Sequence, residues 1–405
     1  MAFPMPRPRK RSVLVLGSTG SIGRSALAVI REHPDRFSVA ALAARGSVES
    51  FVAQVREFRP KAAALLEPAA AEEARRALRG VKVDIREGLD GILSLFEKPG
   101  ADTALVGIAG AEGLSSTVEA IRRGMRVALA NKESLVMAGP HLLRAAARTG
   151  AEILPVDSEH CAVAQAMLCG RRDEVRRVLL TASGGALRDL PLARLRDARP
   201  RDALRHPTWK MGRRITVDSA TLMNKALEIV EAVHLFGLPP ETVEVVLHRQ
   251  SVVHSMVEFR DGSVIAQMGR PDMRLPILWA LAHPDRPDTP GFRFDVADMA
   301  RLDFAEPDRE RYPALALGWE AARRGDVAGA VLNAADERAV ELFLEGRIRF
   351  TDIAPLVASA LRRVPAGPAP RGEDLGRFLV RARAADAAAR RAVDGMAPAH
   401  GRKAG

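Results

Sequence analysis

The stretch Val13-Leu-Val-Leu-Gly17-Ser-Thr-Gly20-Ser-Ile-Gly23 decides the fold of the first part of this 405-residue chain. Its four apolar residues predict a buried strand, its glycines predict a tight turn, and a helix is expected from about Ser21. Glycine permits close backbone approach, and a helix N-terminus offers free N–H groups and a favourable dipole to a pyrophosphate. The pattern therefore predicts a dinucleotide-binding turn, with a tight turn that binds nothing as the alternative.

Apolar runs of strand length alternate with helical patterns through the first 154 residues. They lie at 13–16, 38–43, 62–66, 103–108, 126–129 and 152–154. This alternation is typical of a Rossmann-like, doubly wound parallel sheet in an α/β protein. Later runs at 175–180, 243–248, 252–259 and 263–268 have shorter links and a hairpin turn at Asp261-Gly262, so they predict a mixed α/β domain. Beyond Tyr312, apolar residues at helical spacing predict a C-terminal α-helical domain.

The expected domain boundaries follow these changes of pattern. They are a disordered basic tail at 1–11, a Rossmann-like nucleotide-binding domain at 12–150, the mixed α/β domain at 151–283 with a lid loop at 184–213, a linker at 284–311, the helical domain at 312–393 and a disordered tail at 394–405. The linker is expected because Pro and Asp are frequent at 283–290.

The net charge of +11 is spread through the chain, since 53 of the 61 basic residues are arginines used throughout the sequence. Aromatic residues make up only 4%, which leaves few side chains to stack on bases, so no nucleic-acid partner is expected. Cys161 and Cys169 lack the spacing of a redox pair or a zinc site, and no apolar run is long enough for a signal peptide or a membrane span. These features predict a cytoplasmic protein with reduced thiols and no membrane partner.

The end of the second predicted strand indicates which nucleotide fits. An NAD-binding domain usually has an acidic residue there for the adenosine ribose. This chain has Leu42-Ala-Ala-Arg45-Gly-Ser47, and Arg45 and Ser47 suit a 2′-phosphate. NADPH is therefore the expected cofactor.

Asp157 and Glu159 follow a predicted buried strand in the motif Pro155-Val-Asp-Ser-Glu-His160. Carboxylates two residues apart on extended chain can point the same way, and hard oxygen ligands of this kind select Mg²⁺ or Mn²⁺. The same pattern also occurs in solvated loops and at helix N-caps, and Asp157 could cap a helix that begins near His160.

Residues 217–228 are expected to form a helix with Ser219 near its start. Asn224 and Lys225 precede Glu228 by four and three residues, so their polar heads can share one face. A surface salt bridge would have the same spacing. Against that alternative, Lys225 and Lys132 are two of only eight lysines in an arginine-rich chain, and both lie in dense polar motifs.

Ser183-Gly184-Gly185 ends another predicted strand and begins a segment that reaches His206 and Trp209. Glycine at both ends of this segment, together with an exposed Trp and a His, predicts a lid over a site, with an ordinary long loop as the alternative.

Seven blocks of this chain, taken together and in order, resemble the 1-deoxy-D-xylulose 5-phosphate reductoisomerase family. The blocks are 17–23, 130–134, 154–160, 217–221, 223–228, 271–274 and 332–337, and the resemblance runs from Val13 to about Arg390. The chain departs from the usual family pattern at Ser47, Ala182, Ala186-Leu187, Lys210 and Arg249. None of these departures removes an expected metal ligand or phosphate donor.

The resemblance implies a role for each polar motif. Asp157, Glu159 and Glu228 are implied to hold one divalent ion, Mg²⁺, Mn²⁺ or Co²⁺. The implied substrate-binding residues are Lys132, Ser158, Glu159, Ser183, His206, Trp209, Ser219, Asn224, Lys225 and Glu228, of which Ser183, Ser219, Asn224 and Lys225 bind a phosphate. The residues implied to face NADPH are Thr19, Gly20, Ser21, Ile22, Arg45, Gly46, Ser47, Asn131, Glu133 and Gly212. The implied catalytic residues are Lys132, Asp157, Glu159, His206 and Glu228.

The family's activity is the NADPH-dependent conversion of 1-deoxy-D-xylulose 5-phosphate to 2-C-methyl-D-erythritol 4-phosphate, a metal-assisted rearrangement followed by hydride reduction, in non-mevalonate isoprenoid precursor synthesis. The resemblance implies this activity here, with catalysis in the mixed α/β domain, a small phosphorylated sugar as substrate and a homodimer as the assembly. Two alternatives are an NADP-dependent semialdehyde dehydrogenase, which needs a nucleophilic Cys, and a non-catalytic nucleotide-sensing module. Cysteines on an apolar helical stretch disfavour the first, and the three carboxylates disfavour the second.

Overall fold

The structure is a computed structural model, and it describes residues 10–97, 100–209, 211–293, 295, 297, 301–365, 367 and 373–397. Lys210 and most of both expected tails lie outside the described residues. Contacts divide the chain into two compact units. The first comprises the residues up to Asn131 together with 144–161 and 272–290, and the second comprises 132–143, 162–271 and the residues from Gly291 onward. The functional domain boundaries expected from the sequence stay a prediction.

The first unit contains a seven-stranded sheet in the order β4-β3-β2-β1-β5-β6-β7, in which all neighbouring strands are parallel. The strands are β1 (Arg11–Leu16), β2 (Phe37–Ala44), β3 (Ala62–Leu65), β4 (Asp84–Glu87), β5 (Thr103–Val106), β6 (Arg126–Leu129) and β7 (Glu152–Pro155). The strand order runs outward from β1 in both directions, which is the doubly wound topology predicted from the sequence. The expected fold class is confirmed.

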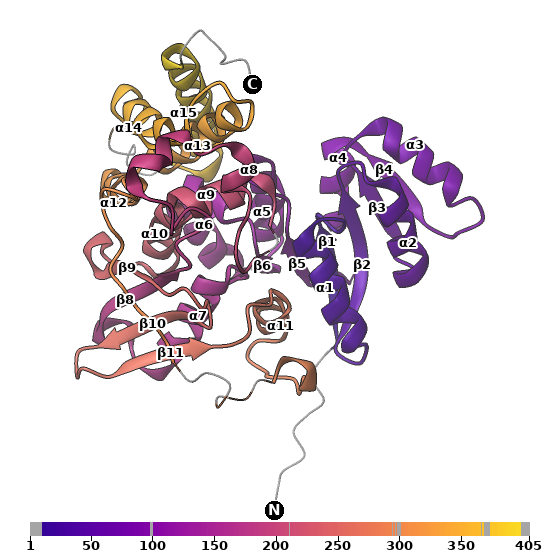
Figure 1. Cartoon of the computed structure of the whole chain (residues 1–405). Helices are drawn as coiled ribbons and strands as arrows, with labels where there is room; N and C mark the ends of the chain where they lie inside the picture. The colour runs from indigo at the N-terminus through magenta and orange to yellow at the C-terminus, as the bar shows by residue number, and fades with distance from the viewer. Residues whose placement is uncertain are drawn as a thin grey trace, which may run out of the picture. The chain divides into compact units, whose positions relative to one another are not determined.

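Helices connect these strands, as Figure 1 shows for the indigo and violet part of the chain. The connecting helices are α1 (Ser21–Glu32), α2 (Val48–Phe58), α3 (Pro68–Ala77), α4 (Gly88–Ser94), α5 (Gly113–Arg122) and α6 (Lys132–Thr149), with short 3₁₀ turns η1 (Leu95–Glu97) and η2 (Gly110–Glu112). Helix α7 (Ser158–Ala166) follows β7, and α11 (Arg274–Ala282) and the 3₁₀ turn η7 (Pro290–Phe292) come later in the chain. Helix α6 bends at Ala138, and the chain passes from the second unit into the first within this helix.

The glycine turn after β1 lies against the end of β5. Gly17 has a φ of +85°, and a Cβ there would lie 2.6 Å from the carbonyl oxygen of Gly107. At Gly23 a Cβ would lie 2.3 Å from the carbonyl oxygen of Gly17. Backbone atoms cannot move aside cheaply, so both positions require glycine. Helix α1 begins at Ser21, where the sequence predicts it.

Strand β4 was not expected from the sequence. Its residues Asp84–Glu87 have the pattern Asp-Ile-Arg-Glu, and none of them is fully buried. The strand pairs only with β3 at the edge of the sheet. An edge strand does not need the apolar run that marks a central parallel strand, so its sequence carries little signal.

The second unit is built on a four-stranded sheet in the order β11-β10-β8-β9, in which β8 and β9 are parallel and the other neighbours antiparallel. The strands are β8 (Val175–Ala182), β9 (Val243–Leu247), β10 (Val253–Phe259) and β11 (Val264–Met268). The predicted Asp261-Gly262 turn joins β10 to β11, and Gly262 has a φ of +88°. This is the mixed sheet that the shorter links predict.

Helices complete the second unit, and Figure 1 shows the later ones gathered in orange and yellow. They are α8 (Pro200–Ala203), α9 (Arg213–Thr221), α10 (Met223–Phe236), α12 (Ala314–Arg324), α13 (Ala328–Leu344), α14 (Ile353–Arg363) and α15 (Leu375–Met396), with 3₁₀ turns η3 (Met167–Cys169), η4 (Arg172–Glu174), η5 (Leu192–Asp197), η6 (Pro240–Thr242) and η9 (Phe350–Asp352). Helix α13 is buried along most of its length and packs against α12, α14 and α15. Helix α15 continues to Met396, past residue 394 where the tail was expected to start.

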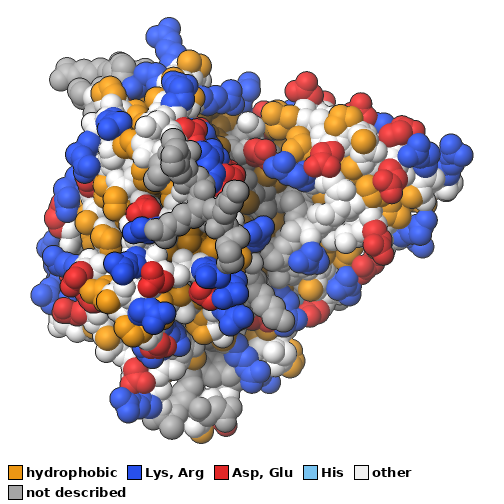
Figure 2. All heavy atoms as spheres, turned by 45° about the horizontal axis from the view of Figure 1, so that its top comes forward, with side chains coloured by type: hydrophobic (Ala, Val, Ile, Leu, Met, Phe, Trp, Pro, Cys, Tyr) orange, Lys and Arg blue, Asp and Glu red, His pale blue; other side chains and the backbone are white. Residues whose placement is uncertain are grey.

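Basic and acidic side chains alternate over the face shown in Figure 2 and do not form one large basic patch there. This agrees with the even spread of arginine along the sequence. Among the described residues, no helix is long and apolar enough to cross a membrane.

Replacing Gly23 by Ala is expected to destabilise the first unit. The new Cβ would collide with the backbone of Gly17 and Ser18, and overpacking of this kind typically costs about 1–3 kcal/mol. The measurement is the urea midpoint of the cofactor-free protein. Gly20→Ala is the matched control, because its Cβ would approach the Gly17 oxygen only to 3.3 Å. Equal midpoints for the two variants would contradict the prediction.

Candidate functional site

The residues predicted from the sequence divide between the two units. Thr19, Gly20, Ser21, Ile22, Arg45, Gly46, Ser47, Asn131, Asp157, Ser158 and Glu159 belong to the first unit, and Lys132, Glu133, Ser183, His206, Trp209, Gly212, Ser219, Asn224, Lys225 and Glu228 belong to the second.

Glu228 is a fully buried carboxylate at the centre of the polar cluster in the second unit. Its Oε1 accepts from Lys132 Nζ at 3.2 Å and from Asn224 Nδ2 at 2.5 Å, and its Oε2 accepts from Lys225 Nζ at 2.6 Å. Both lysines are themselves buried. These contacts confirm that Asn224, Lys225 and Glu228 share one face of α10, and they exclude an exposed surface salt bridge.

Two ammonium groups contact the one buried carboxylate of Glu228, and burying such charges is costly unless each is paired. Lys132 also donates to Asn224 Oδ1 at 2.9 Å, so the start of α6 and the start of α10 are tied together.

Ser219 does not lie near the start of the helix that carries Glu228. The segment expected to be one helix is two, because Leu222 adopts a left-handed φ of +56° between α9 and α10. Ser219 is near the end of α9, while Asn224 and Lys225 are in the first turn of α10. The break at Leu222 is a feature that periodicity alone does not reveal.

Ser183 follows β8 and lies in a tightly held loop. Its hydroxyl is 3.0 Å from His206 Nε2, and it accepts from the backbone N–H of Gly185 at 3.2 Å. A Cβ on Gly185 would lie 2.4 Å from the carbonyl oxygen of Ser219, so the loop packs directly on the end of α9. Two of the predicted phosphate donors, Ser183 and Ser219, are brought together in this way.

The hydrogen bonds of His206 fix its tautomer. Nδ1 accepts hydrogen bonds from the backbone N–H groups of Thr208 at 3.1 Å and Trp209 at 2.8 Å. The ring proton therefore lies on Nε2, which donates a hydrogen bond to the Ser183 hydroxyl. Burial, followed by the positive charge of Arg188, lowers the pKa of His206 to about 4. The ring is therefore neutral near pH 7. The indole of Trp209 lies 6.4 Å from the ring of His254, measured between centroids.

The nucleotide-site candidates of the first unit surround the turn after β1. Gly20 is the N-cap of α1 and has no side chain to occupy the free N–H groups that follow. Arg45 is exposed and forms an ion pair with Glu112 at 2.5 Å. Asn131 is buried and donates to the carbonyl oxygen of Gly110 at 2.9 Å.

The acidic motif of the first unit lies where β7 passes into α7. Asp157 immediately precedes the helix, and its carbonyl oxygen accepts the backbone N–H of Cys161 at 2.8 Å. Helix α7 begins at Ser158, two residues before the expected start near His160. The Ser158 hydroxyl donates to the Glu159 carboxylate, and His160 is fully buried. Half-buried carboxylates of this kind are hard oxygen donors of the type that Mg²⁺ binds.

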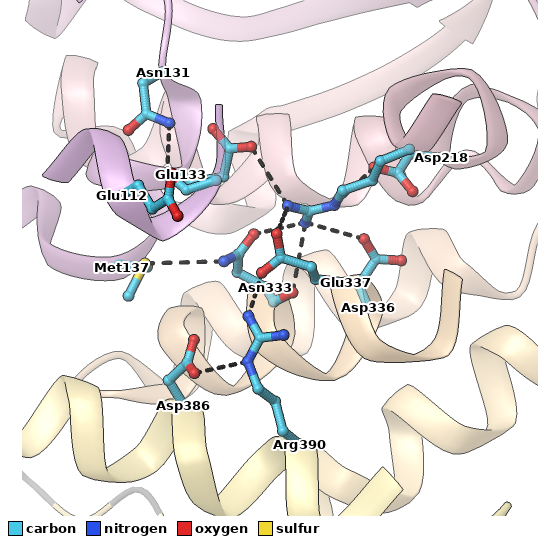
Figure 3. A network of polar contacts seen from close by, with 12 residues as sticks. Glu112, Asn131, Glu133, Met137, Asp218, Asn333, Asp336, Glu337, Asp386 and Arg390 are labelled. Carbon is cyan, nitrogen blue, oxygen red and sulfur yellow. Dashed lines mark hydrogen bonds and ion pairs between the residues drawn. The ribbon is translucent and has the colours of Figure 1, made fainter. Parts of the chain in front are cut away.

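A second acidic cluster, which the sequence analysis missed, surrounds the mostly buried guanidinium of Arg214 on α9 (Figure 3). Four carboxylates lie 3.1–3.5 Å from it, those of Glu133, Asp218, Asp336 and Glu337. The guanidinium also donates to Asn333 Oδ1 at 2.7 Å. Arg390 on α15 pairs with Glu337 and with Asp386, so α9, α13 and α15 are joined through one network.

Two of these carboxyls are strongly perturbed. Burial, together with the nearby Asp336, raises the pKa of Asp218 well above its ordinary value. Burial also raises the pKa of Asp336, to about 6, although Arg214 acts in the opposite direction. Asp218 adjoins Ser219 and Glu133 adjoins Lys132, so this cluster supports two segments of the candidate site. Arg214 was missed because one arginine among 53 carries no distinguishing signal.

Comparisons with protein families agree on one assignment along most of the chain. The family profile of 1-deoxy-D-xylulose 5-phosphate reductoisomerase matches residues 13–139. The C-terminal domain profile of the same enzyme matches 153–236, and the DXP reductoisomerase C-terminal domain profile matches 268–392.

Individual relatives give the same result. Proteins named 1-deoxy-D-xylulose 5-phosphate reductoisomerase from Aromatoleum aromaticum and Chlorobaculum tepidum are each 48% identical to this chain, covering 90% and 87% of it and 92% of each relative. A solved structure of the Zymomonas mobilis reductoisomerase with NADPH is 41% identical, with a TM-score of 0.88, and covers 97% of this chain and 100% of that one. A reductoisomerase structure with NADPH, fosmidomycin and magnesium is 38% identical, with a TM-score of 0.89, over 95% and 98% of the two chains.

Removing the guanidinium of the acidic cluster is expected to be strongly destabilising. Arg214→Met leaves buried carboxylates without their shared cation, and breaking a buried ion network in this way costs about 3–5 kcal/mol. Urea unfolding at pH 7 measures the change. Arg377→Met, on an exposed part of α15, is the control and should stay within about 0.5 kcal/mol of the wild type. A loss below 1 kcal/mol for Arg214→Met would contradict the prediction.

The same cluster is expected to make stability depend on pH. The pKa values of Asp218 and Asp336 are raised on folding, so the folded protein binds these protons more tightly than the unfolded chain. Their contribution to stability is therefore fully present below the ordinary pKa of 3.8. The contribution of Asp336 is lost as the pH rises through about 6, and that of Asp218 is lost as the pH rises through its own raised pKa. Asp218→Asn, which resembles the protonated acid, should flatten this decline in urea midpoints measured from pH 4 to 8. A variant that declines as steeply as the wild type would refute the assignment.

Proposed function

This chain belongs to the 1-deoxy-D-xylulose 5-phosphate reductoisomerase family, and we propose that it converts 1-deoxy-D-xylulose 5-phosphate and NADPH, with one proton, to 2-C-methyl-D-erythritol 4-phosphate and NADP⁺. The observation that carries the proposal is the fully buried Glu228 carboxylate held by Lys132 and Lys225. A buried cluster of this kind is not needed by a nucleotide sensor.

NADPH would bind at the turn after β1. The close approach of backbone at Gly17 and Gly23 leaves no space for a side chain there, which fits a turn that presents N–H groups to a pyrophosphate. Thr19, Gly20, Ser21 and Ile22 would contact the phosphates. Arg45 would exchange its ion pair with Glu112 for the 2′-phosphate, beside Gly46 and Ser47. Asn131, Glu133 and Gly212 would complete the NADPH contacts.

Asp157, Glu159 and Glu228 would hold a divalent cation, and their carboxylate oxygens fit Mg²⁺, with Mn²⁺ or Co²⁺ as substitutes. When bound, such a cation polarises the substrate ketone and stabilises negative charge that develops on oxygen. Lys132 would orient the cluster by donating to Glu228 and Asn224, and Ser158 would hold a substrate hydroxyl beside Glu159.

The substrate phosphate would be bound by Ser183, Ser219, Asn224 and Lys225. Ser183 and Ser219 lie on segments that pack together, and Asn224 and Lys225 follow in the next helix. Neutral His206 donates a hydrogen bond to the oxygen of Ser183. The serine O–H is therefore available to donate a hydrogen bond to a phosphate oxygen. Trp209 would cover the carbon backbone of the substrate, and the loop at 184–213 would act as the lid that excludes water.

The rearrangement would break one carbon–carbon bond by a retro-aldol step and form another by an aldol step, giving a branched aldehyde. Hydride transfer from NADPH to the aldehyde carbon, with a proton added to its oxygen, would complete the reaction. The product is a precursor for the non-mevalonate route to isoprenoids, and the enzyme would act as a cytoplasmic homodimer. The proposed catalytic residues are Lys132, Asp157, Glu159, His206 and Glu228.

Addition of 1-deoxy-D-xylulose 5-phosphate is expected to cause oxidation of NADPH in the presence of Mg²⁺ or Mn²⁺. The fall in absorbance of NADPH at constant protein measures the rate. Excess chelator should abolish turnover, and restored metal should recover it, because the cation stabilises charge that forms during the reaction. Absence of turnover with metal and NADPH both present would overturn the proposed function.

Glu228→Gln is expected to lower kcat by at least about 100-fold while the affinity for NADPH, measured by fluorescence titration, stays within threefold. The amide keeps the shape of the side chain but lacks the charge that a divalent cation and two ammonium groups require. Glu241→Gln is the control, because Glu241 is exposed and pairs only at the surface with Arg323. If the two variants had equal rates, Glu228 would not belong to the site.

A further inference from the structure

Arg188 is a cation of the Ser183 loop to which neither the sequence motifs nor the proposed reaction gives a role. It lies five residues after Ser183, and its Nη1 donates to the carbonyl oxygen of Ser183 at 2.7 Å. Its side chain is only 18% exposed. The guanidinium therefore lies at the loop that presents the proposed phosphate donor.

The charge of Arg188 is only weakly neutralised. The carboxylate beside it is that of Asp189, which lies 3.5 Å from Nε and is largely exposed. Asp189 makes a shorter ion pair with Arg249, so most of its charge is directed away from Arg188. Among the described residues, no hydrogen bond is formed by Nη2 of Arg188, which leaves donors for a ligand.

The two lysines of the polar cluster, unlike Arg188, share their charge with a buried carboxylate. Lys132 and Lys225 both donate to the buried Glu228, and in the proposed site that carboxylate also faces a divalent cation. Ser183 contributes a neutral hydroxyl, and His206 is neutral at physiological pH. In the proposed site Lys225 brings the phosphate an ammonium group that it shares with Glu228, whereas Ser183 and His206 contribute no full positive charge on their side.

We propose that Arg188 is a specificity-determining residue for the phosphate group of the substrate, with its guanidinium supplying the positive charge on the Ser183 side of the phosphate. This inference rests on the proposed function, because it concerns the same substrate. A guanidinium presents several N–H groups in a fixed fork that matches phosphate oxygens, which favours a phosphorylated sugar over a neutral one.

The loop is held rigidly enough to place this charge. Tyr312, the only tyrosine in the chain, donates its buried hydroxyl to the carbonyl oxygen of Gly184 at 2.9 Å. Arg311 donates to the carbonyl oxygen of Leu187 at 3.0 Å. Two residues that lie three and two positions before α12 thus hold both ends of the segment between Ser183 and Arg188.

The test uses the full-length protein and inorganic phosphate as the probe. Calorimetric titration of phosphate should give an affinity at least about tenfold weaker for Arg188→Gln than for the wild type, since a charge-assisted hydrogen bond contributes about 1.5–3 kcal/mol. Arg188→Lys should recover part of the affinity. The control is Arg323→Gln, which removes an exposed positive charge that pairs with Glu241 at the surface and should leave the phosphate affinity unchanged.

Steady-state kinetics provide the second measurement. For Arg188→Gln the KM for 1-deoxy-D-xylulose 5-phosphate should rise by at least about tenfold, while kcat changes less than threefold and the affinity for NADPH stays the same. A phosphate affinity equal to that of the wild type would overturn the inference, and so would a loss matched by Arg323→Gln or by an equal loss of NADPH binding and thermal stability. Failure of the wild type to turn over the substrate would instead overturn the proposed function, because the phosphate titration does not depend on turnover.

Discussion

The burial of the Glu228 carboxylate between two ammonium groups is the constraint on which the candidate site depends. A charge at this depth is tolerable only when its partners are held in place, and here each oxygen has at least one nitrogen donor. Lys225 and Asn224 come from the same helix as Glu228, whereas Lys132 comes from the start of α6. The fold must therefore keep α6 and α10 in register, and much of the second unit serves that requirement.

The Arg214 cluster is the main support for this register. It connects Glu133, beside Lys132, with Asp218, beside Ser219, and both with the C-terminal helix α13. Helix α13 is thus linked through charge to two segments of the candidate site. The excess of carboxylates over guanidinium groups explains why a proton is retained there, since two adjacent buried acids cannot both ionise cheaply.

The loop between Ser183 and Arg188 is likewise held in place by contacts from other segments of the chain. Its carbonyl groups accept hydrogen bonds from the side chains of Tyr312 and Arg311, and Gly185 packs against the end of α9. The tautomer of His206 is set by two backbone N–H groups. Preorganisation of this kind lowers the cost of ordering donors around an anion, which is why a short loop can form a specific site.

The sequence by itself determined the doubly wound sheet, the glycine turn and the shared face of Asn224, Lys225 and Glu228, because these depend on local spacing and on buried apolar runs. Local sequence also marked Asp157 and Glu159 as possible Mg²⁺ ligands. Resemblance to a family added their joint role with Glu228 and the phosphate donors, and these roles remain proposals. Local pattern failed at β4, where an edge strand needs no apolar run, and at Leu222, where a single left-handed residue divides one expected helix into two. Only the tertiary structure decided that Arg214 collects four carboxylates and that Arg188 lies against Ser183. In both cases the packing of helices and loops brings the partners together. The charge balance of a buried group therefore depends on residues that are distant in the sequence, and the local sequence does not show which residues these are.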